Sequence, residues 1–370
     1  MKPKVSICVP NLNTRPFLPE RFQTIRDQSF QEWELLVYDS YSNDGAWEYI
    51  CEIAAHEPRM RIWQGPREGT PASWNPCIRE ARGEYVYIAT SDDTMPADCI
   101  EKLVSALDAN PDCDLAHCPL RAIDENGEDV VEMRKWWSEA SVFVQSSGPL
   151  LNCLHVRRAP FDGLLHLLGG SVYVSITQLL IRRTLFDRIG GFESRWGSVG
   201  DFNWNMRAAL VANTVHVPDT WGGWRVHRSQ ATAGIGLGSS EHVRKIDDMI
   251  EHAIETSRDN LSPSVWQRLG STWVCEAKKR RTFAREVQAR SNSRLKRRSF
   301  ILWRFLTAST SAREYVKSHM SGGFPSDWVR RCLDETGHGP ALVRARTRSE
   351  RPSAINDFNM PGQVPAVPVR

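Results

Sequence analysis

The segment Tyr85-Val86-Tyr87-Ile88-Ala89-Thr90-Ser91-Asp92-Asp93 joins an apolar run to a short polar turn that ends in two acidic residues. An uninterrupted apolar run bounded by turn residues is typical of a strand that is buried on both faces of a parallel sheet. Ligands of such sheets bind beyond the carboxyl ends of the strands, where Asp92 and Asp93 are expected to lie. Adjacent carboxylates repel each other unless a positive group joins them. The pair therefore indicates either a Mg²⁺ or Mn²⁺ site or an acidic helix entry near Pro96.

Apolar runs and helical patterns alternate on both sides of this segment. The predicted strands cover residues 5–9, 35–38, 61–63, 85–89 and 178–181, and the predicted helices cover 17–28, 47–55, 73–81, 96–110, 184–189 and 201–210. The early strands begin about 25–30 residues apart, which is the length of a βαβ unit. We therefore predict an α/β fold with a mostly parallel sheet flanked by helices, while residues 120–170 carry no assignment.

The composition indicates a soluble globular protein, because 41% of the 370 residues are hydrophobic and 25% are charged. The net charge of +3 is too small to predict nucleic-acid binding. No apolar run approaches the ~18 residues of a membrane-spanning helix, and the apolar start is too short for a secretory signal. Nine scattered cysteines without an export signal favour reduced thiols and a cytoplasmic location. Cys113 and Cys118 lack the second pair that a zinc site needs, so we expect them in the core.

Asp39 follows the second predicted strand and opens the turn 39–45. A carboxylate at this place can accept hydrogen bonds from a nucleobase or a ribose. The same turn can also serve only as a cap for the next helix.

Four motifs in order along residues 4–230 resemble glycosyltransferase family 2, whose members have the GT-A fold. They are the opening strand and turn at 5–13, the acidic turn at 39–45, the segment 81–86 followed by Ser91-Asp92-Asp93, and the segments 180–183, 189–192 and 200–202. The resemblance implies a Rossmann-like GT-A sheet and inverting transfer of a sugar from a nucleoside-diphosphate-sugar, with UDP as the expected nucleotide.

The resemblance also implies roles for single residues. The donor nucleotide would be bound by Pro10, Asn11, Asn13, Asp39 and Asp92, and a divalent metal (Mn²⁺ or Mg²⁺) by Asp92, Asp93 and His227. A lone histidine such as His227 can equally be structural. Asp201 would be the catalytic base. The chain departs from the family at Thr90, where another aspartate is common, and at Gly200, where an acidic residue commonly precedes the base.

Trp196 and Trp204 lie close to Asp201 in the sequence. Their aromatic faces could stack on an acceptor sugar, or they could fill the core beneath the site. The acceptor would be a carbohydrate or a glycolipid, which points to polysaccharide or glycolipid synthesis.

The chain is expected to divide into a catalytic domain at 1–240, a helical basic region at 241–345 and a disordered tail at 346–370. Ten Lys and Arg residues lie between 278 and 298, and bulky apolar residues follow up to 305. This stretch is either a solvated helix face or a peripheral contact with an anionic membrane on its inner, cytoplasmic face. Nucleic-acid binding is not expected, because no recognition module accompanies the stretch.

Two other functions compete with an active glycosyltransferase. A nucleotidyltransferase would usually carry a glycine-rich basic loop after the first strand, and residues 10–16 contain no glycine. A degenerate relative that binds a sugar nucleotide without transferring the sugar stays open because of Thr90 and Gly200.

Overall fold

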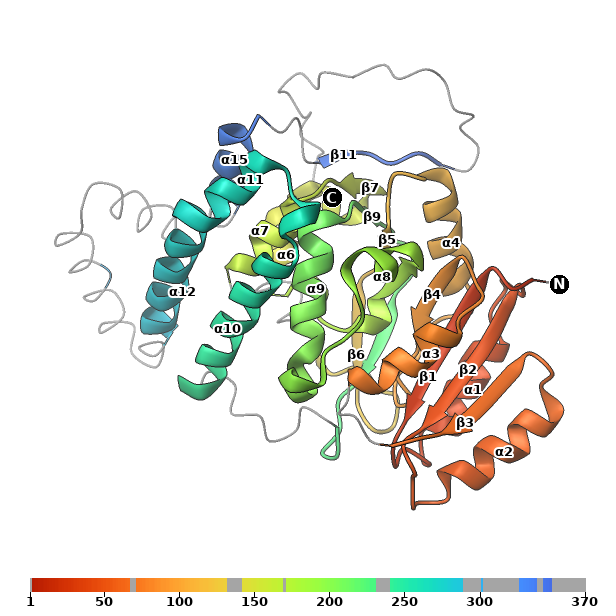
Figure 1. Cartoon of the computed structure of the whole chain (residues 1–370). Coiled ribbons are helices and arrows are strands. Elements are labelled where there is room, and N and C mark those ends of the chain that lie inside the picture. The colour runs from red at the N-terminus through yellow and green to blue at the C-terminus, as the bar shows by residue number, and fades with distance from the viewer. Residues whose placement is uncertain are drawn as a thin grey trace.

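The computed structural model describes residues 2–66, 71–131, 142–168, 171–230, 240–288, 301, 326–337 and 342–347. A nine-stranded sheet in the order β11-β7-β9-β5-β8-β4-β1-β2-β3 runs through its centre (Figure 1). The strands are β1 Val5–Asn11, β2 Trp33–Asp39, β3 Met60–Gln64, β4 Tyr85–Ile88, β5 Leu115–His117, β7 His155–Arg157, β8 Leu179–Arg182, β9 Thr214–His216 and β11 Leu342–Arg344. Only β7 and β8 run opposite to the other strands of this sheet, so the prediction of a mostly parallel α/β sheet is confirmed.

Helices cover both faces of the sheet, because neighbouring residues of each strand enter different cores. Ile7 and Val9 pack on one side and Cys8 on the other. The first side is covered by α1 Leu18–Arg26, α2 Ala46–His56 and α4 Cys99–Ala109, and the second by α3 Asn75–Glu80, α7 Phe161–Leu167, α8 Thr184–Ile189 and α9 Gly200–Val211. A strand buried on both faces has no polar alternation, which is why the early strands could be recognised as plain apolar runs.

β1 continues two residues beyond its predicted end, through Pro10 to Asn11. Ala89 N donates to Cys8 O, and Ser40 N donates to Asn11 O, so alternate residues of β1 face β4 and β2. Pro10 is on the β4 side, where pairing ends at Cys8 opposite Ile88. An N–H at position 10 would point past the end of β4, so proline loses no strand hydrogen bond there. Asn11 stays in the sheet and pairs with Asp39.

Several strands that follow β4 in the chain were not predicted from the sequence. β5, β7 and β9 have three residues each, and a second sheet pairs β6 Leu120–Ile123 with β10 Gly222–Arg225 in parallel. Thr94 and Gly223 exchange backbone hydrogen bonds of 3.1 and 2.9 Å. This bridge brings the segment 225–227 against the turn that follows β4.

The C-terminal region contributes α10 Ser240–Thr256, α11 Pro263–Arg268, α12 Val274–Gln288 and α15 Ser326–Glu335. These helices gather on the side of α7 and α9, and α10 packs along α9 (Figure 1). The segment 241–345 is not wholly helical, since β11 adds an antiparallel edge strand beside β7. Residues 348–370 of the predicted tail lie outside the described residues.

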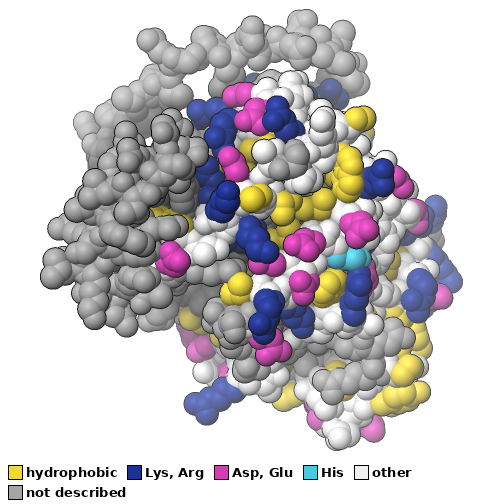
Figure 2. Space-filling view, turned by 60° about the vertical axis from the view of Figure 1, so that its left-hand side comes forward, with side chains coloured by type: hydrophobic (Ala, Val, Ile, Leu, Met, Phe, Trp, Pro, Cys, Tyr) yellow, Lys and Arg dark blue, Asp and Glu magenta, His cyan; other side chains and the backbone are white. Residues whose placement is uncertain are grey.

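The predicted basic stretch 278–305 is described only at 278–288 and 301. Within that part Arg281 is buried and its guanidinium pairs with Asp247 at 2.5 Å. On the face shown in Figure 2, the described Lys and Arg side chains are interspersed with Asp and Glu. Among the described residues, no helix is both long and apolar enough to cross a membrane.

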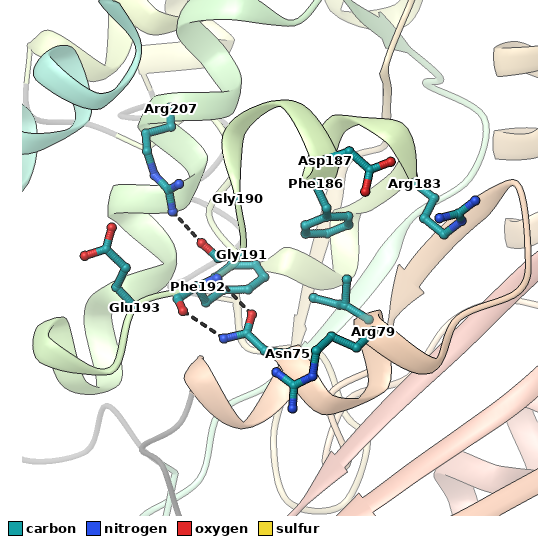
Figure 3. Close-up of a pocket in the computed structure, with 11 residues that line it drawn as sticks. Asn75, Arg79, Arg183, Phe186, Asp187, Gly190, Gly191, Phe192, Glu193 and Arg207 are labelled. Carbon is teal, nitrogen blue, oxygen red and sulfur yellow. Dashed lines mark hydrogen bonds between the residues drawn. The ribbon is translucent and has the colours of Figure 1, made fainter.

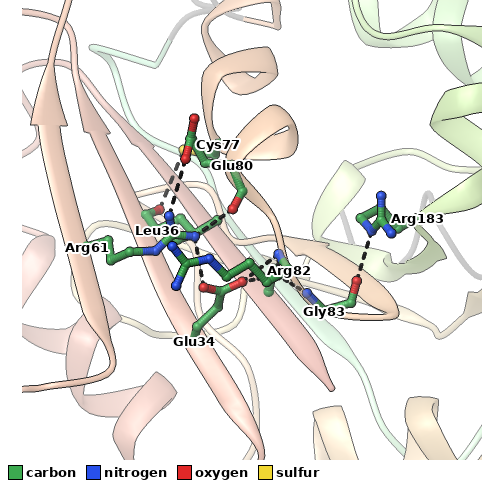
Figure 4. Close-up of polar contacts among 9 residues, drawn as sticks. Glu34, Leu36, Arg61, Cys77, Glu80, Arg82, Gly83 and Arg183 are labelled. Atoms are coloured by element: carbon green, nitrogen blue, oxygen red, sulfur yellow. Dashed lines mark hydrogen bonds and ion pairs between the residues drawn. The ribbon is translucent and has the colours of Figure 1, made fainter. Parts of the chain in front are cut away.

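The amino ends of β1, β2 and β3 are tied together by Glu34 (Figure 4). One carboxylate oxygen of Glu34 accepts from Ser6 Oγ at 2.6 Å and from Arg82 N at 2.7 Å, and the other accepts from Arg61 at 2.9 Å. These bonds fix the end of the sheet opposite to the candidate site.

Candidate functional site

The carboxylate of Asp39 is buried at the carboxyl end of β2 and accepts four hydrogen bonds. Asn11 Nδ2 and Ser42 Oγ donate to one oxygen, each at 2.6 Å, and Ser42 N and Gln64 Nε2 donate to the other at 3.0 and 2.9 Å. Asp39 thereby joins the ends of β1, β2 and β3. The carboxylate itself has no exposed surface. The groups that face solvent here belong to the loops that Asp39 holds in place.

Asn13 and Tyr41 form the exposed rim of this cluster. Both have left-handed backbones, with φ of 53° and 54°. Asn13 N donates to Ser42 Oγ at 2.9 Å, and Asn43 N donates to Asn13 Oδ1 at 2.9 Å. The loops after β1 and β2 are therefore cross-linked into one surface.

Asp93 points into the protein after β4. Its side chain accepts from Thr90 Oγ1 through one oxygen and from Arg225 N at 2.8 Å through the other. Burial, reinforced by the charge of Asp92, raises the pKa of Asp93 to about 7. Both oxygens already serve internal bonds, so Asp93 supports the turn and Thr90 acts as its hydrogen-bond partner.

Asp92 points outward and meets His227. Asp92 Oδ2 lies 2.9 Å from His227 Nε2, and the two side chains are 22% and 3% exposed. His227 Nδ1 contacts Ser229 Oγ at 2.9 Å, which fixes the orientation of the ring. One carboxylate oxygen and one imidazole nitrogen fit a divalent transition metal that takes its other ligands from phosphate and water. Among the described residues, no group of three His, Cys, Asp or Glu side chains could hold a metal.

Arg225 is a residue of this site that the sequence analysis missed. Its guanidinium is 1% exposed and donates to Asp92 O at 2.8 Å, to Asp124 O at 2.7 Å and to Glu20 Oε2 at 2.5 Å. Arg225 thus fixes the Ser91–Asp93 turn to β10, to the loop after β6 and to α1. The only sequence signal was its position two residues before His227.

Asp201 lies in the first turn of α9, whose N-terminal end is on the same side of the molecule as the carboxyl ends of β1 and β2 (Figure 1). Burial raises the pKa of its carboxyl to about 6, and Phe202 N donates to it at 3.0 Å. A Cβ on Gly200 would lie 3.1 Å from Trp196 Cβ and 3.5 Å from Pro71 Cγ. An acidic side chain at position 200 would therefore have little room, because Trp196 lies close to that position.

The two predicted acceptor tryptophans differ in exposure. Trp196 is partly exposed, and its ring packs against Arg195 and His252. Trp204 is fully buried, stacks on Phe186 and Phe192, and donates from Nε1 to Gly190 O at 2.9 Å. Trp204 faces the core because α9 packs between α7, α8 and α10, so in this structure it has no surface for an acceptor.

A cavity of about 630 Å³ lies between α3 and the loop after α8 (Figure 3), and neither Asp92 nor Asp201 lines it. At its edge Asn75 donates to Phe192 O at 2.8 Å and accepts from Phe192 N at 2.9 Å. A Cβ on Gly191 would lie 2.4 Å from Asn75 Oδ1, so glycine is needed there. The cavity therefore lies where α3 meets the segment that leads to α9 and Asp201.

The comparisons with known proteins agree on one family. The model described as Glycosyl transferase family 2 matches residues 6–188. The chain is 28% identical over 102 residues to the putative teichuronic acid biosynthesis glycosyltransferase TuaG of Bacillus subtilis, covering 27% of this chain and 40% of TuaG. It is 30% identical over 127 residues to the putative glycosyltransferase EpsE of the same organism, covering 34% of this chain and 46% of EpsE. The chain thus spans less than half the length of these relatives.

Solved structures share the fold. Residues 1–349 of TarS from S. aureus superpose with a TM-score of 0.55 at 17% identity, over 81% of this chain and 77% of TarS. TarS has also been solved in complex with UDP-GlcNAc, with a TM-score of 0.50 at 15% identity over 72% of this chain and 73% of TarS. The mannosyltransferase PcManGT of Pyrobaculum calidifontis, in complex with GDP-Man and Mn²⁺, gives 0.51 at 18% identity over 91% and 86%. The expected GT-A architecture is confirmed.

Proposed function

Because the chain is a glycosyltransferase of family 2, we propose that it moves a sugar from a nucleoside-diphosphate-sugar to a hydroxyl acceptor with inversion at the anomeric carbon. The observation that carries the proposal is the pair of partly exposed Asp92 and buried His227, held by Arg225 beside the loops that Asp39 orders. Ligands of parallel sheets bind at this edge.

The donor side is formed by the ends of β1, β2 and β4. Asn11 and Asp39 hold the loops after β1 and β2, and Asn13 presents a polar side chain to the nucleotide. Asp92 and His227 would hold Mn²⁺ or Mg²⁺, and the ion would supply positive charge for the diphosphate leaving group. The Mn²⁺ in the PcManGT complex supports this assignment. We assign Asp93 to support of the turn, because its oxygens are already bonded.

The acceptor side is assigned to Asp201 and Trp196. The raised pKa of Asp201, about 6, leaves it ionised at neutral pH and makes it a stronger base than an exposed aspartate. It would accept the proton of the acceptor hydroxyl as the oxygen attacks the anomeric carbon. We assign Trp196 to the acceptor sugar because its ring, which packs against Arg195 and His252, is still partly exposed.

For the finer identity of the substrates, we propose a UDP-linked donor and a polysaccharide or glycolipid acceptor. The UDP-GlcNAc complex of TarS favours a UDP-linked donor, and the teichuronic acid role in the name of TuaG favours a polysaccharide or glycolipid acceptor. We place the reaction in the cytoplasm, with the basic stretch 278–305 as a contact to the inner membrane face.

Nucleoside diphosphates provide the first test of the donor site. UDP, GDP and dTDP are added to the full chain with and without Mn²⁺, and the melting temperature is measured. One diphosphate should raise the melting temperature, and Mn²⁺ should increase the rise, because ligands that bind only the folded state stabilise it. Stabilisation by none of them would contradict the proposal. Binding without transfer or donor hydrolysis would favour a sugar-nucleotide-binding protein.

Replacing Arg225 with Lys should weaken Mn²⁺ binding in the presence of UDP by about 10–100-fold, as loss of partners behind a metal ligand typically does. A lysine cannot reach Asp92 O, Asp124 O and Glu20 at once. Calorimetric titration with Mn²⁺ measures the effect, and circular dichroism checks the fold. Arg121→Lys on neighbouring β6, whose partner Asp129 is partly exposed, is the matched control. Unchanged Mn²⁺ affinity in folded Arg225→Lys would refute the role.

A further inference from the structure

Tyr41 presents an aromatic ring to solvent at the carboxyl end of β2, two residues after Asp39. The residue is 62% exposed, and in the described part of the chain only Val131 is another large hydrophobic residue of similar exposure. Rings of this size are usually buried for their large apolar area. The exposed ring of Tyr41 therefore has no packing role that would account for it.

The backbone of Tyr41 is also held in an unfavourable conformation. Its φ of 54° lies in the left-handed region, which is rare for bulky residues. The bonds on either side enforce this conformation. Ser42 N and Ser42 Oγ donate to Asp39 at 3.0 and 2.6 Å, and Asn13 N donates to Ser42 Oγ at 2.9 Å. Strain that is kept by so many bonds is typical of ligand sites.

The position of Tyr41 relative to the Asp92–His227 pair fits the length of a nucleotide. The sheet order β4-β1-β2 separates the ends of β4 and β2 by two strand spacings, roughly 10 Å. A diphosphate at Asp92 and His227 would therefore leave its ribose over β1 and its base over β2. The exposed side chain of Asn13 lies on the same rim and can supply polar contacts.

We propose that Tyr41 stacks on the nucleobase of the sugar-nucleotide donor and is the main source of affinity for the base. This inference rests on the proposed function, since it takes the edge of the sheet to bind a nucleoside diphosphate. The strained backbone then has a purpose: it directs the ring away from the protein and over the donor.

Three variants separate the ring from the strain. Tyr41→Phe keeps the ring and should bind UDP as the wild type does. Tyr41→Asn loses the ring in a residue that tolerates the left-handed region, and UDP binding should weaken about tenfold, as loss of base stacking typically causes. Tyr41→Gly should weaken UDP binding equally, while its melting temperature rises because the strain is relieved. Calorimetric titration with UDP and Mn²⁺, and thermal melting, provide both readouts.

Pyrophosphate with Mn²⁺ is the control ligand, because it has no base. Its affinity should be the same in the wild type and in all three variants. Equal UDP affinity in wild type and Tyr41→Asn would overturn the stacking role. Parallel weakening of UDP and pyrophosphate would also overturn it, since the loop would then act on the whole site. A wild type that binds no nucleoside diphosphate would overturn the proposed function and, with it, this inference.

Discussion

Asp201→Asn is expected to lower the turnover number by about 10²–10⁴-fold, the range that a positioned general base contributes. The amide has the size of the carboxylate and can still accept the hydrogen bond from Phe202 N, so the first turn of α9 should stay intact. It cannot take a proton from the acceptor hydroxyl. UDP affinity should remain that of the wild type, because Asp92 and His227 are untouched. Steady-state rates and UDP titration measure the two effects separately.

The pH dependence of the rate offers a second readout for Asp201. Its pKa is raised to about 6 by burial, so the base becomes protonated, and the rate should fall, as the pH drops below about 6. An exposed aspartate would stay active to about pH 4. Asp187→Asn, at an exposed position of α8, is the control and should keep the wild-type rate. Near-normal transfer by Asp201→Asn would mean that another residue is the base.

The difference between the two aspartates of the turn after β4 shows where prediction from the sequence ends. The sequence places Asp92 and Asp93 after a buried strand, and the structure confirms that strand as β4. Which carboxylate faces outward depends on Thr90 and on the backbone of Arg225, and Arg225 lies 132 residues away from Asp93 in the chain. No local pattern carries that information.

Strand length sets a similar limit on the fold. β1, β2 and β4 are four to seven residues long and mostly apolar and could be predicted, whereas β5, β7 and β9 are three residues long and show no periodicity. Trp204 could be assigned to the acceptor or to the core from the sequence, and only the packing of α9 against α8 and α10 places it in the core. The roles of Asp201, Asp39 and His227 came from the resemblance, and they stay predictions.

Acid pH is expected to destabilise the protein through four buried histidines, His117, His155, His166 and His216. Burial, with the nearby charge of Arg157, lowers the pKa of His155 to about 4 and that of His216 to about 3. Burial also lowers the pKa of His166 to about 4 and places that of His117 well below its ordinary value. Asp162 lies in the same cluster and already pairs with Arg157 at 2.7 Å. Its carboxylate is therefore not free to neutralise a histidine that gains a proton.

The direction of the pH effect on stability follows from which state, folded or unfolded, binds more protons. Between pH 6.5 and 4 the unfolded chain protonates these histidines and the folded protein does not, so the free energy of unfolding falls as the pH falls. At pH 5 each histidine with a folded pKa near 4 costs about 2 kcal/mol. Asp93 and Asp201 act in the opposite direction, because their raised pKa values make the folded state bind protons more tightly. The histidines are more numerous, so a net loss is expected.

A variant isolates the histidine contribution from that of the aspartates. His155→Gln removes one titrating ring on β7, so its loss of stability between pH 7.5 and 5 should be smaller than that of the wild type by about 2 kcal/mol. Val156→Ala is the matched control. Val156 is the neighbour of His155 on β7 and is buried in the core on the other face of the sheet, so this change should lower stability at both pH values without altering the difference. Urea unfolding at the two pH values measures both. An equal pH dependence in wild type and His155→Gln would show that His155 is already charged in the folded protein.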